Sequence, residues 1–214
     1  MKDIKLKYFK ASREESIFDE DEKYGLCFFC KTDEFPQVEL DESVEIITES
    51  KEEIEIVCLD CLLKEKYAFK QIVEGGFLTK DGIVKESDKY EYLKDDSNYL
   101  TDLLPLENQL LNMDKLKIKN LTHTPPFRTW QDATWLVHCK DFMTFIGTWE
   151  HEDFVKNSPD GNAKEFFDDI LDNWNGDDFY DKQFGPDKSE YAESTFYAFQ
   201  CQGCKKYRGF VDNA

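Results

Sequence analysis

The sequence predicts an α+β protein with small antiparallel sheets and several helices. Cysteines occur as closely spaced pairs next to short alternating apolar stretches, which is typical of metal-binding turns between strands. Apolar residues at helical spacing follow these stretches. The 214 residues are 40% hydrophobic and 15% aromatic, which is enough to fill a core. We therefore expect zinc-ribbon or treble-clef-like knuckles beside the helices.

The charge of the chain is strongly negative. It carries 27 basic and 46 acidic residues, a net charge of -19, and its lysines are scattered among the acids. Such a field repels phosphate backbones, so we expect no nucleic-acid partner.

The sequence predicts that the cysteines lie in a reducing compartment. The first 25 residues lack the apolar core of a secretory signal, and no apolar run is long enough to span a bilayer. We therefore expect a cytoplasmic protein with no membrane segment. Cytosolic thiols stay reduced, and seven cysteines cannot all pair, so their spacing indicates metal or redox chemistry.

The N-terminal half alternates between strand and helix patterns. Residues 4–9 suggest a short strand, and residues 27–62, with the alternating segment 44–57, suggest a strand pair with a cysteine pair at either end. The second cysteine pair opens a predicted helix that continues over 62–73 and stops at Gly75-Gly76. Residues 87–120 are again helical in pattern, with an interruption at Pro105.

A double proline after Thr124 marks our predicted domain boundary. Residues 1–123 form an N-terminal knuckle region with a helical extension, and residues 124–214 form a β-rich C-terminal knuckle region, unless the two make one compact unit. In the second region we expect two strands around His138-Cys139, a helix over 163–173, an acidic loop over 175–190 and a final hairpin with CQGC at its turn.

Aromatic residues are dense at the start of the C-terminal region. A ligand groove and a hydrophobic core both explain them, and the core is the commoner role for aromatics on strands. The residues concerned are Phe127, Trp130, Trp135, Phe142, Phe145 and Trp149.

The stronger metal-site signal lies in the first half, where two CxxC pairs supply Cys27, Cys30, Cys58 and Cys61. Two such knuckles complete the tetrahedral sulfur shell that zinc prefers. Placing the second pair at a helix N-terminus also stabilises thiolates, as in a treble-clef finger. Buried thiols without metal and a redox dithiol are the alternatives.

A second zinc site is predicted from Cys139, Cys201 and Cys204, with His138 as the first choice for the fourth ligand. Adjacent strand residues point to opposite faces, so His138 and Cys139 share a metal only if the strand ends or bulges there. The other candidates for the fourth ligand are His123, His151 and Asp141. A core thiol at Cys139 beside a plain turn at CQGC remains the alternative.

The sequence resembles the CbrC family. The resemblance rests on the early CxxC, the CLDC that opens a helix, the block TPPFRTWQDATWLVHCKDFMTFIG and the closing YAFQCQGCKKYRGFVD. The chain departs from the family at Leu59-Asp60, at Pro126-Phe127 and at Lys205, where Pro-Trp, Gly-Tyr and Gly are usual. The resemblance implies the cysteine framework and an association with colicin tolerance, and no molecular activity.

Together these features predict a zinc-stabilised protein that binds another protein. Large negative charge steers association with basic partners, and a basic toxin is one such partner. No catalytic nucleophile stands out, since P-loop, Rossmann and nucleophile-elbow motifs are missing from the sequence. The alternative is an enzyme whose second zinc site is open, with Asp141 as its base.

Overall fold

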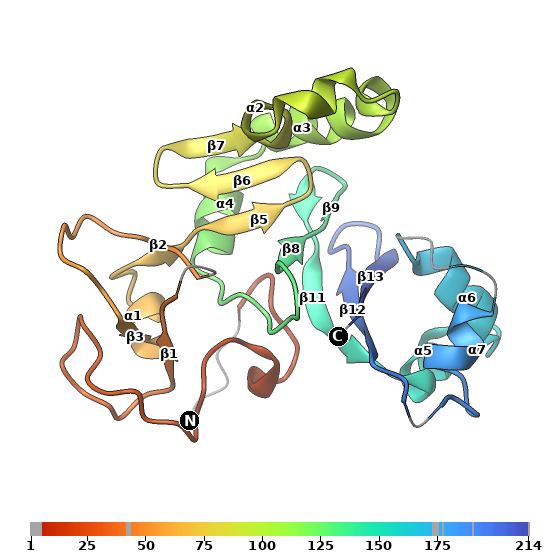
Figure 1. The fold of residues 1–214 in the computed structure, drawn as a ribbon, viewed down its shortest axis with the longest axis horizontal. Helices are drawn as coiled ribbons and strands as arrows, with labels where there is room; N and C mark the ends of the chain where they lie inside the picture. The colour runs from red at the N-terminus through yellow and green to blue at the C-terminus, as the bar shows by residue number, and fades with distance from the viewer. Residues whose placement is uncertain (1–5, 42–43, 173–175, 177, 190, 214) are drawn as a thin grey trace.

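The computed structural model describes residues 6–41, 44–172, 176, 178–189 and 191–213. The elements within these ranges form an α+β fold of small sheets, nearly all antiparallel, and several helices (Figure 1). The predicted fold class is therefore confirmed. No helix in the described ranges combines the length and the apolar character needed to cross a membrane.

The first cysteine region is built on a short strand pair. Strand β1 (Gln37–Glu39) pairs antiparallel with β3 (Ile56–Cys58), and β3 runs directly into helix α1 (Leu59–Leu63). Strand β2 (Ile46–Ile47) pairs with β4 (Ala68–Phe69). The predicted strand pair between the two cysteine pairs is therefore confirmed, although the partner of β3 is β1, which precedes the alternating segment. Strand β2 pairs outside this range, and Ile46 packs with Phe69 in the core that surrounds the cysteines.

The helix predicted over 62–73 ends after one turn. Glu65 takes a left-handed φ of 55°, which stops α1, and the chain continues as strands β4 and β5 (Gln71–Val73). Strand β5 then forms a hairpin with β6 (Gly76–Thr79), and Gly75 turns it with a φ of 84°. The two glycines thus turn a hairpin, where the sequence analysis placed the end of a helix.

A four-stranded sheet has the order β7-β6-β5-β8. Strand β7 (Gly82–Lys85) lies at one edge, and β8 (Thr134–Trp135) pairs parallel to β5 at the other. The helices that follow β7 are α2 (Glu86–Lys89), η2 (Glu91–Asp95), the π-helical turn η3 (Tyr99–Leu103), α3 (Leu104–Leu111) and α4 (Lys115–Thr122). Of these, α2 and α3 lie beside β7 (Figure 1).

Pro105 lies in the first turn of α3. A proline is well tolerated there, because the first helical N–H groups have no intrahelical acceptor. The predicted helical character of 87–120 is thus confirmed, and Pro105 lies where the π-helical turn that precedes it changes to the α-helix.

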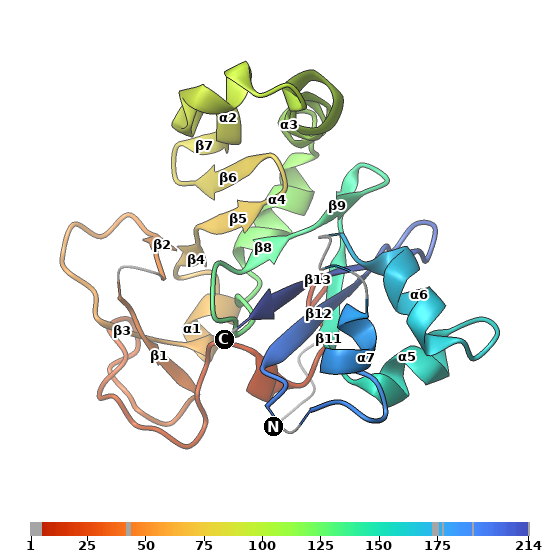
Figure 2. The same cartoon turned by 45° about the vertical axis from the view of Figure 1, so that its right-hand side comes forward.

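The C-terminal region contains a three-stranded sheet with helices on one face (Figure 2). Its strands are β11 (Thr144–Trp149), β12 (Ser194–Gln200) and β13 (Tyr207–Asn213), and its helices are α5 (His151–Asn157), α6 (Ala163–Ile170) and α7 (Phe179–Gln183). Helix α6 and the final hairpin confirm their predictions. Helix α7 lies where we predicted only a loop, because Phe179 and Tyr180 pack onto α6. Residues 173–175, 177 and 190 of or near that predicted loop lie outside the described residues.

The two sequence halves contact each other through several segments. Phe9 forms a β-bridge with Phe145, and β5 pairs with β8 across the predicted boundary. Residues 4 and 5 of the predicted first strand lie outside the described residues. The division of the chain near residue 124 stays a prediction.

Candidate metal centres

The first cysteine pair lies in a tight turn. The N–H of Cys27 donates to the carbonyl of Thr32 at 3.0 Å, and the N–H of Lys31 donates back to the carbonyl of Cys27 at 2.9 Å. Lys31 takes a left-handed φ of 58° to close this turn. The turn is held against β3 by the N–H of Phe28, which donates to the carbonyl of Ile56.

The second cysteine pair lies where β3 becomes α1. Cys58 is the N-cap residue of the helix and Cys61 lies in its first turn, as predicted. Gln37 pairs with Cys58 in the β1–β3 ladder, and its amide donates to the carbonyl of Gly25 at 2.8 Å. One side chain therefore connects the first knuckle to the strand that presents the second.

The four sulfur atoms of this first group lie within 4.8 Å of one another. Cys27 Sγ is 3.9 Å from Cys61 Sγ, and Cys30 Sγ is 3.6 Å from Cys58 Sγ. Four sulfurs around a zinc ion at about 2.3 Å would be about 3.8 Å apart in a regular tetrahedron. All four thiols are free. The arrangement fits a tetrahedral metal ion without rearrangement of the backbone.

The first group is largely buried, and burial changes the pKa values of its thiols. Burial raises the pKa of the Cys61 thiol to about 12 and raises the pKa of the Cys58 thiol even more. Burial also opposes ionisation of Cys27, but backbone N–H groups of Cys30 and Phe29 donate to its sulfur and hold its pKa below the ordinary value. Crowded thiols cannot all ionise without a cation, so a divalent metal would displace protons here.

The second group contains a knuckle of the same design as the first. The N–H of Cys201 donates to the carbonyl of Lys206 at 2.9 Å, and the N–H of Lys205 donates to the carbonyl of Cys201 at 3.1 Å. Lys205 takes a left-handed φ of 67°. Cys204 completes this knuckle at the turn between β12 and β13.

His138 and Cys139 reach the second group from one turn. His138 is the last residue of β9 (Val137–His138), which pairs with β10 (Asp141–Phe142). Cys139 and Lys140 follow with left-handed φ values of 52° and 57°. The strand ends between the two candidate ligands, which is the condition the sequence required for both to face one ion.

The donor atoms of His138, Cys139, Cys201 and Cys204 lie within 4.8 Å of one another. His138 Nδ1 is 3.4 Å from Cys204 Sγ, near the roughly 3.6 Å expected between N and S ligands of one zinc ion. A hydrogen-bonding interaction with Cys204 raises the pKa of the Cys139 thiol to about 11. Backbone N–H groups lower the pKa of Cys204, so the thiols of this group also differ in acidity.

The other three candidates for the fourth ligand have different partners. His123 Nδ1 lies 2.8 Å from the carbonyl of Lys119, and His151 Nδ1 lies 2.8 Å from the hydroxyl of Tyr180. Asp141 accepts from Tyr8 at 2.6 Å and from Lys7 at 3.0 Å, and these interactions outweigh its burial and lower its pKa. Of the candidate fourth ligands, the structure brings only His138 to the three sulfurs.

The structure also contains a cleft, and Phe127 and Trp130, two of the six aromatic residues for which the sequence left a ligand groove open, line it. It encloses about 690 Å³ between the first cysteine region, β5 and residues 126–133. Five of these six aromatic residues are buried as expected, and the sixth, Trp130, is 70% exposed. The polar neighbours of Trp130 in the sequence, Arg-Thr before it and Gln-Asp after it, were the signal that set it apart from the other tryptophans.

Comparison with known proteins adds a family and no activity. The Uncharacterised protein family (UPF0167) matches the chain over residues 7–213, a range that includes both cysteine groups. No curated protein and no solved structure matches it significantly. Because the family match covers nearly all of its length, the chain belongs to the uncharacterised protein family UPF0167.

Proposed function

We propose that each group binds one Zn²⁺ ion and that both ions are structural. The observation that carries this proposal is the convergence of four donors in each group at separations close to those of a tetrahedral zinc shell. Thiolate and imidazole donors in tetrahedral sets are typical of zinc, and four protein ligands are typical of structural sites.

The packing around the first group supports a structural role. Cys27, Cys58 and Cys61 belong to a buried cluster with Tyr67 and Phe69. This cluster is separate from the central core, which is the buried cluster that contains Trp135, Phe145 and Phe199. The cysteine cluster lies in a region whose strands are only two or three residues long. An ion bound there would join the two knuckles and stabilise this small core.

An open catalytic second site receives less support. Its four donors already supply a full tetrahedral set. Asp141, the base required by that alternative, is held by Tyr8, Lys7 and Lys117. A carboxylate with these partners is a weak base, because each of them stabilises its charged form.

The zinc proposal is tested by metal analysis of the purified protein. We expect two zinc ions per chain, one fewer after Cys27→Ser or Cys201→Ser, and no change after Lys31→Ala, a neighbour that is not a donor. X-ray absorption should show sulfur and nitrogen ligands only. A chain that purifies with fewer than two ions, or a water ligand at the second site, contradicts the structural assignment.

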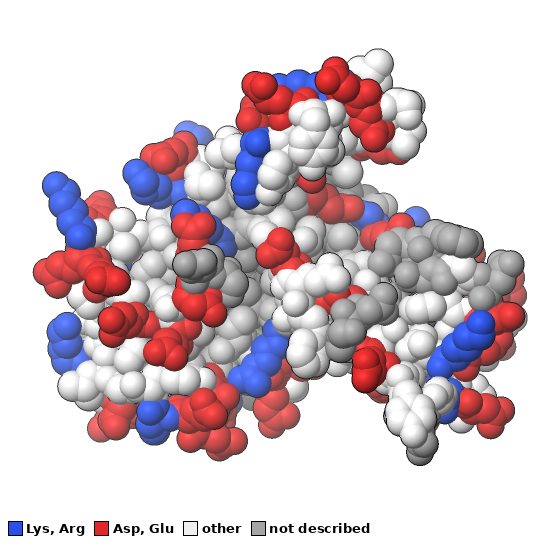
Figure 3. Space-filling view, viewed as in Figure 1, with Lys and Arg blue, Asp and Glu red and all other residues white. Residues whose placement is uncertain are grey.

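We further propose that the zinc-stabilised fold is an interaction module for a basic protein. The net charge of -19 supports it, and Figure 3 shows acidic side chains spread over one face with lysines and arginines scattered between them. Charge of one sign steers an oppositely charged partner and raises its association rate. The colicin-tolerance association implied by the CbrC resemblance supports a basic toxin domain as that partner.

This interaction is tested with the zinc-loaded chain and a panel of purified basic nuclease domains. Binding should be strong at low salt and should weaken steeply as ionic strength rises, because exposed charges are screened beyond a Debye length. Acidic domains of similar size serve as the control and should not bind. If no basic domain binds even at low salt, the interaction proposal fails.

A further inference from the structure

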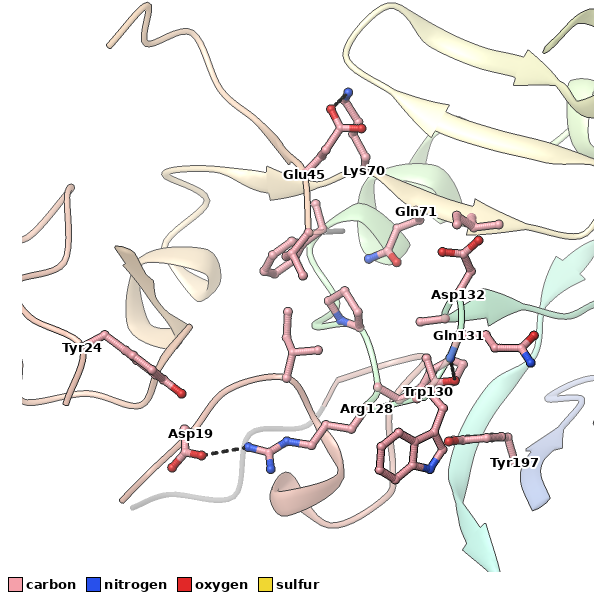
Figure 4. Close-up of a pocket in the computed structure, with 18 of the residues that line it drawn as sticks. Asp19, Tyr24, Glu45, Lys70, Gln71, Arg128, Trp130, Gln131, Asp132 and Tyr197 are labelled. Atoms are coloured by element: carbon pink, nitrogen blue, oxygen red, sulfur yellow. Dashed lines mark hydrogen bonds and ion pairs between the residues drawn. The ribbon is translucent and has the colours of Figure 1, made fainter. Parts of the chain in front are cut away.

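The cleft beside residues 126–133 has the form of a binding site. It lies where the first cysteine region, strand β5 and the central core meet, and its floor contains the apolar side chains of Phe69, Phe127 and Tyr197. Arg128, Trp130 and Asp132 lie on one loop and line one side of the cleft (Figure 4). A volume of about 690 Å³ is within the range of sites that hold several side chains or a small molecule.

The charges that line this cleft favour a cation. Both basic residues of the lining already have carboxylate partners in it, since Lys70 pairs with Glu45 and Arg128 lies 3.1 Å from Asp19. Arg128 also donates to the carbonyl of Ser16 at 2.8 Å. Two further acids, Glu22 and Asp132, leave the lining with an excess of negative charge. A phosphate or other anion would have to displace these carboxylates, whereas a cation would gain from them.

A buried carboxylate, that of Asp212, holds the backbone of Trp130 in place at this cleft. Asp212 is only 3% exposed, and its Oδ2 accepts hydrogen bonds from the hydroxyl of Thr129 at 2.7 Å, the N–H of Trp130 at 3.1 Å and the N–H of Gln131 at 3.0 Å. Its other oxygen, Oδ1, is buried without a hydrogen bond from any described residue. Burying a carboxylate costs free energy unless it accepts hydrogen bonds, and here those bonds come from the loop at residues 129–131. The loop is thereby fixed with the ring of Trp130 exposed to solvent.

We infer that this cleft docks a basic polypeptide segment, with an arginine or lysine side chain over the ring of Trp130 and further basic side chains facing the carboxylates of Asp132 and Glu22. This inference rests on the proposed interaction function and names the surface that performs it. Exposed aromatic rings attract guanidinium and ammonium groups, most strongly when carboxylates lie nearby. A polypeptide fits better than a single small cation, since the lining continues past Trp130 to the apolar floor and to the acids of the first cysteine region.

The test uses the zinc-loaded chain and a fluorescently labelled peptide of alternating arginine and glycine, with an arginine-to-glutamine version as its control. Fluorescence anisotropy should show binding of the arginine peptide only. We expect Trp130→Ala, and separately Glu22→Gln with Asp132→Asn, to weaken binding about tenfold. The double variant Glu52→Gln with Glu53→Gln removes the same charge from an exposed segment outside the cleft and should change binding less than about twofold.

The outcomes separate this inference from the proposed function. If the Glu52/Glu53 variant weakens binding as much as the cleft variants do, the attraction is general and the docking site is wrong. If basic proteins bind the Trp130→Ala chain as tightly as the unchanged chain, the interaction function stands and the cleft is not its site. Failure of every basic protein to bind removes both. Free arginine amide that binds as tightly as the peptide would identify a small-cation site and overturn peptide docking.

Discussion

Two lysines hold an unusual position in the cysteine knuckles. Lys31 and Lys205 each follow the second cysteine of a knuckle, and each takes a left-handed φ, 58° and 67° respectively. Each N–H closes the turn by donating to the carbonyl of the first cysteine. Glycine adopts this conformation without the steric cost that a Cβ atom brings.

Replacing Lys205 by glycine should therefore stabilise the chain. The left-handed conformation costs about 1–2 kcal/mol for a residue with a Cβ, and the greater entropy of glycine in the unfolded chain offsets about 0.4–1 kcal/mol of that. We expect Lys205→Gly to raise the free energy of unfolding by about 0.5–1 kcal/mol in thermal or urea unfolding with zinc present. Lys205→Ala, which keeps the Cβ, is the control, and an equal gain from alanine would contradict the explanation.

The raised thiol pKa values predict a pH-dependent metal affinity. At pH 7 the thiols of Cys61 and Cys139, with pKa values of about 12 and 11, are protonated in the metal-free protein. Metal binding must release these protons, so the metal-free state holds more protons and gains relative stability as the pH falls. Competition with a chelator should show zinc affinity falling at least about tenfold per unit from pH 8 to pH 6. An affinity independent of pH would contradict thiolate ligation.

Among the elements, strand β12 lies between two hydrophobic cores, one on each of its faces. Phe196 and Ala198 pack with the helices α5–α7, while Tyr197 and Phe199 face the central core. This alternation is the period of two expected of a strand buried on both faces. Gly209 on the neighbouring β13 lies directly against Phe196, because a Cβ built there would be 2.3 Å from the ring.

Gly209→Ala should therefore be markedly destabilising. The added methyl group would force the buried Phe196 ring or the β13 backbone to move, which typically costs about 1–3 kcal/mol. Gly203→Ala is a matched control, since a Cβ there would meet its nearest atoms at 3.6 and 3.7 Å, ordinary contact distances. Urea unfolding of the zinc-loaded chain measures both, and a similar stability for the two variants would contradict this packing.

At the scale of the whole molecule, one ion-pair network connects the C-terminal sheet to the four-stranded sheet. Arg208 on β13 donates to both carboxylate oxygens of Glu74, at 3.1 and 2.7 Å, and to the carbonyl of Val137 at 2.9 Å. It also donates to Asp172, which follows α6, at 3.0 Å. The side chains of Arg208 and Glu74 are only 18% and 14% exposed. A single guanidinium thus ties the C-terminal sheet to the end of β5.

Arg208→Ala should lower the free energy of unfolding by about 3–5 kcal/mol, because it leaves Glu74 largely buried without a cation. Arg208→Lys should recover part of this loss, because lysine restores the positive charge. It should not recover all of it, because lysine cannot make the bidentate hydrogen bonds of a guanidinium. Arg128→Ala removes a more exposed pair and should cost clearly less than Arg208→Ala. Equal costs for Arg208→Ala and Arg128→Ala in urea unfolding would show that the network adds little.

The sequence determined by itself the features that depend on local chemistry. The CxxC spacing predicted which cysteines converge, since two residues between cysteines place both sulfurs on one side of a turn. The helix at Cys58, the β9–β10 turn and the final hairpin follow from local patterns in the same way. The choice of His138 required the observation that its strand ends there, which the sequence stated only as a condition.

Other features were decided by contacts between distant residues. The stretch 62–73 has apolar residues near helical spacing, yet after Leu63 it forms strands. The reason is that β4 pairs with β2, while β5 pairs with β6 and, in parallel, with β8 some sixty residues later. The cleft depends on the same kind of contact, since its walls come from segments of both halves and the Trp130 loop is fixed by Asp212 near the C-terminus. Local spacing cannot encode such sites, because hydrogen-bond partners and burial are set only when remote segments pack together.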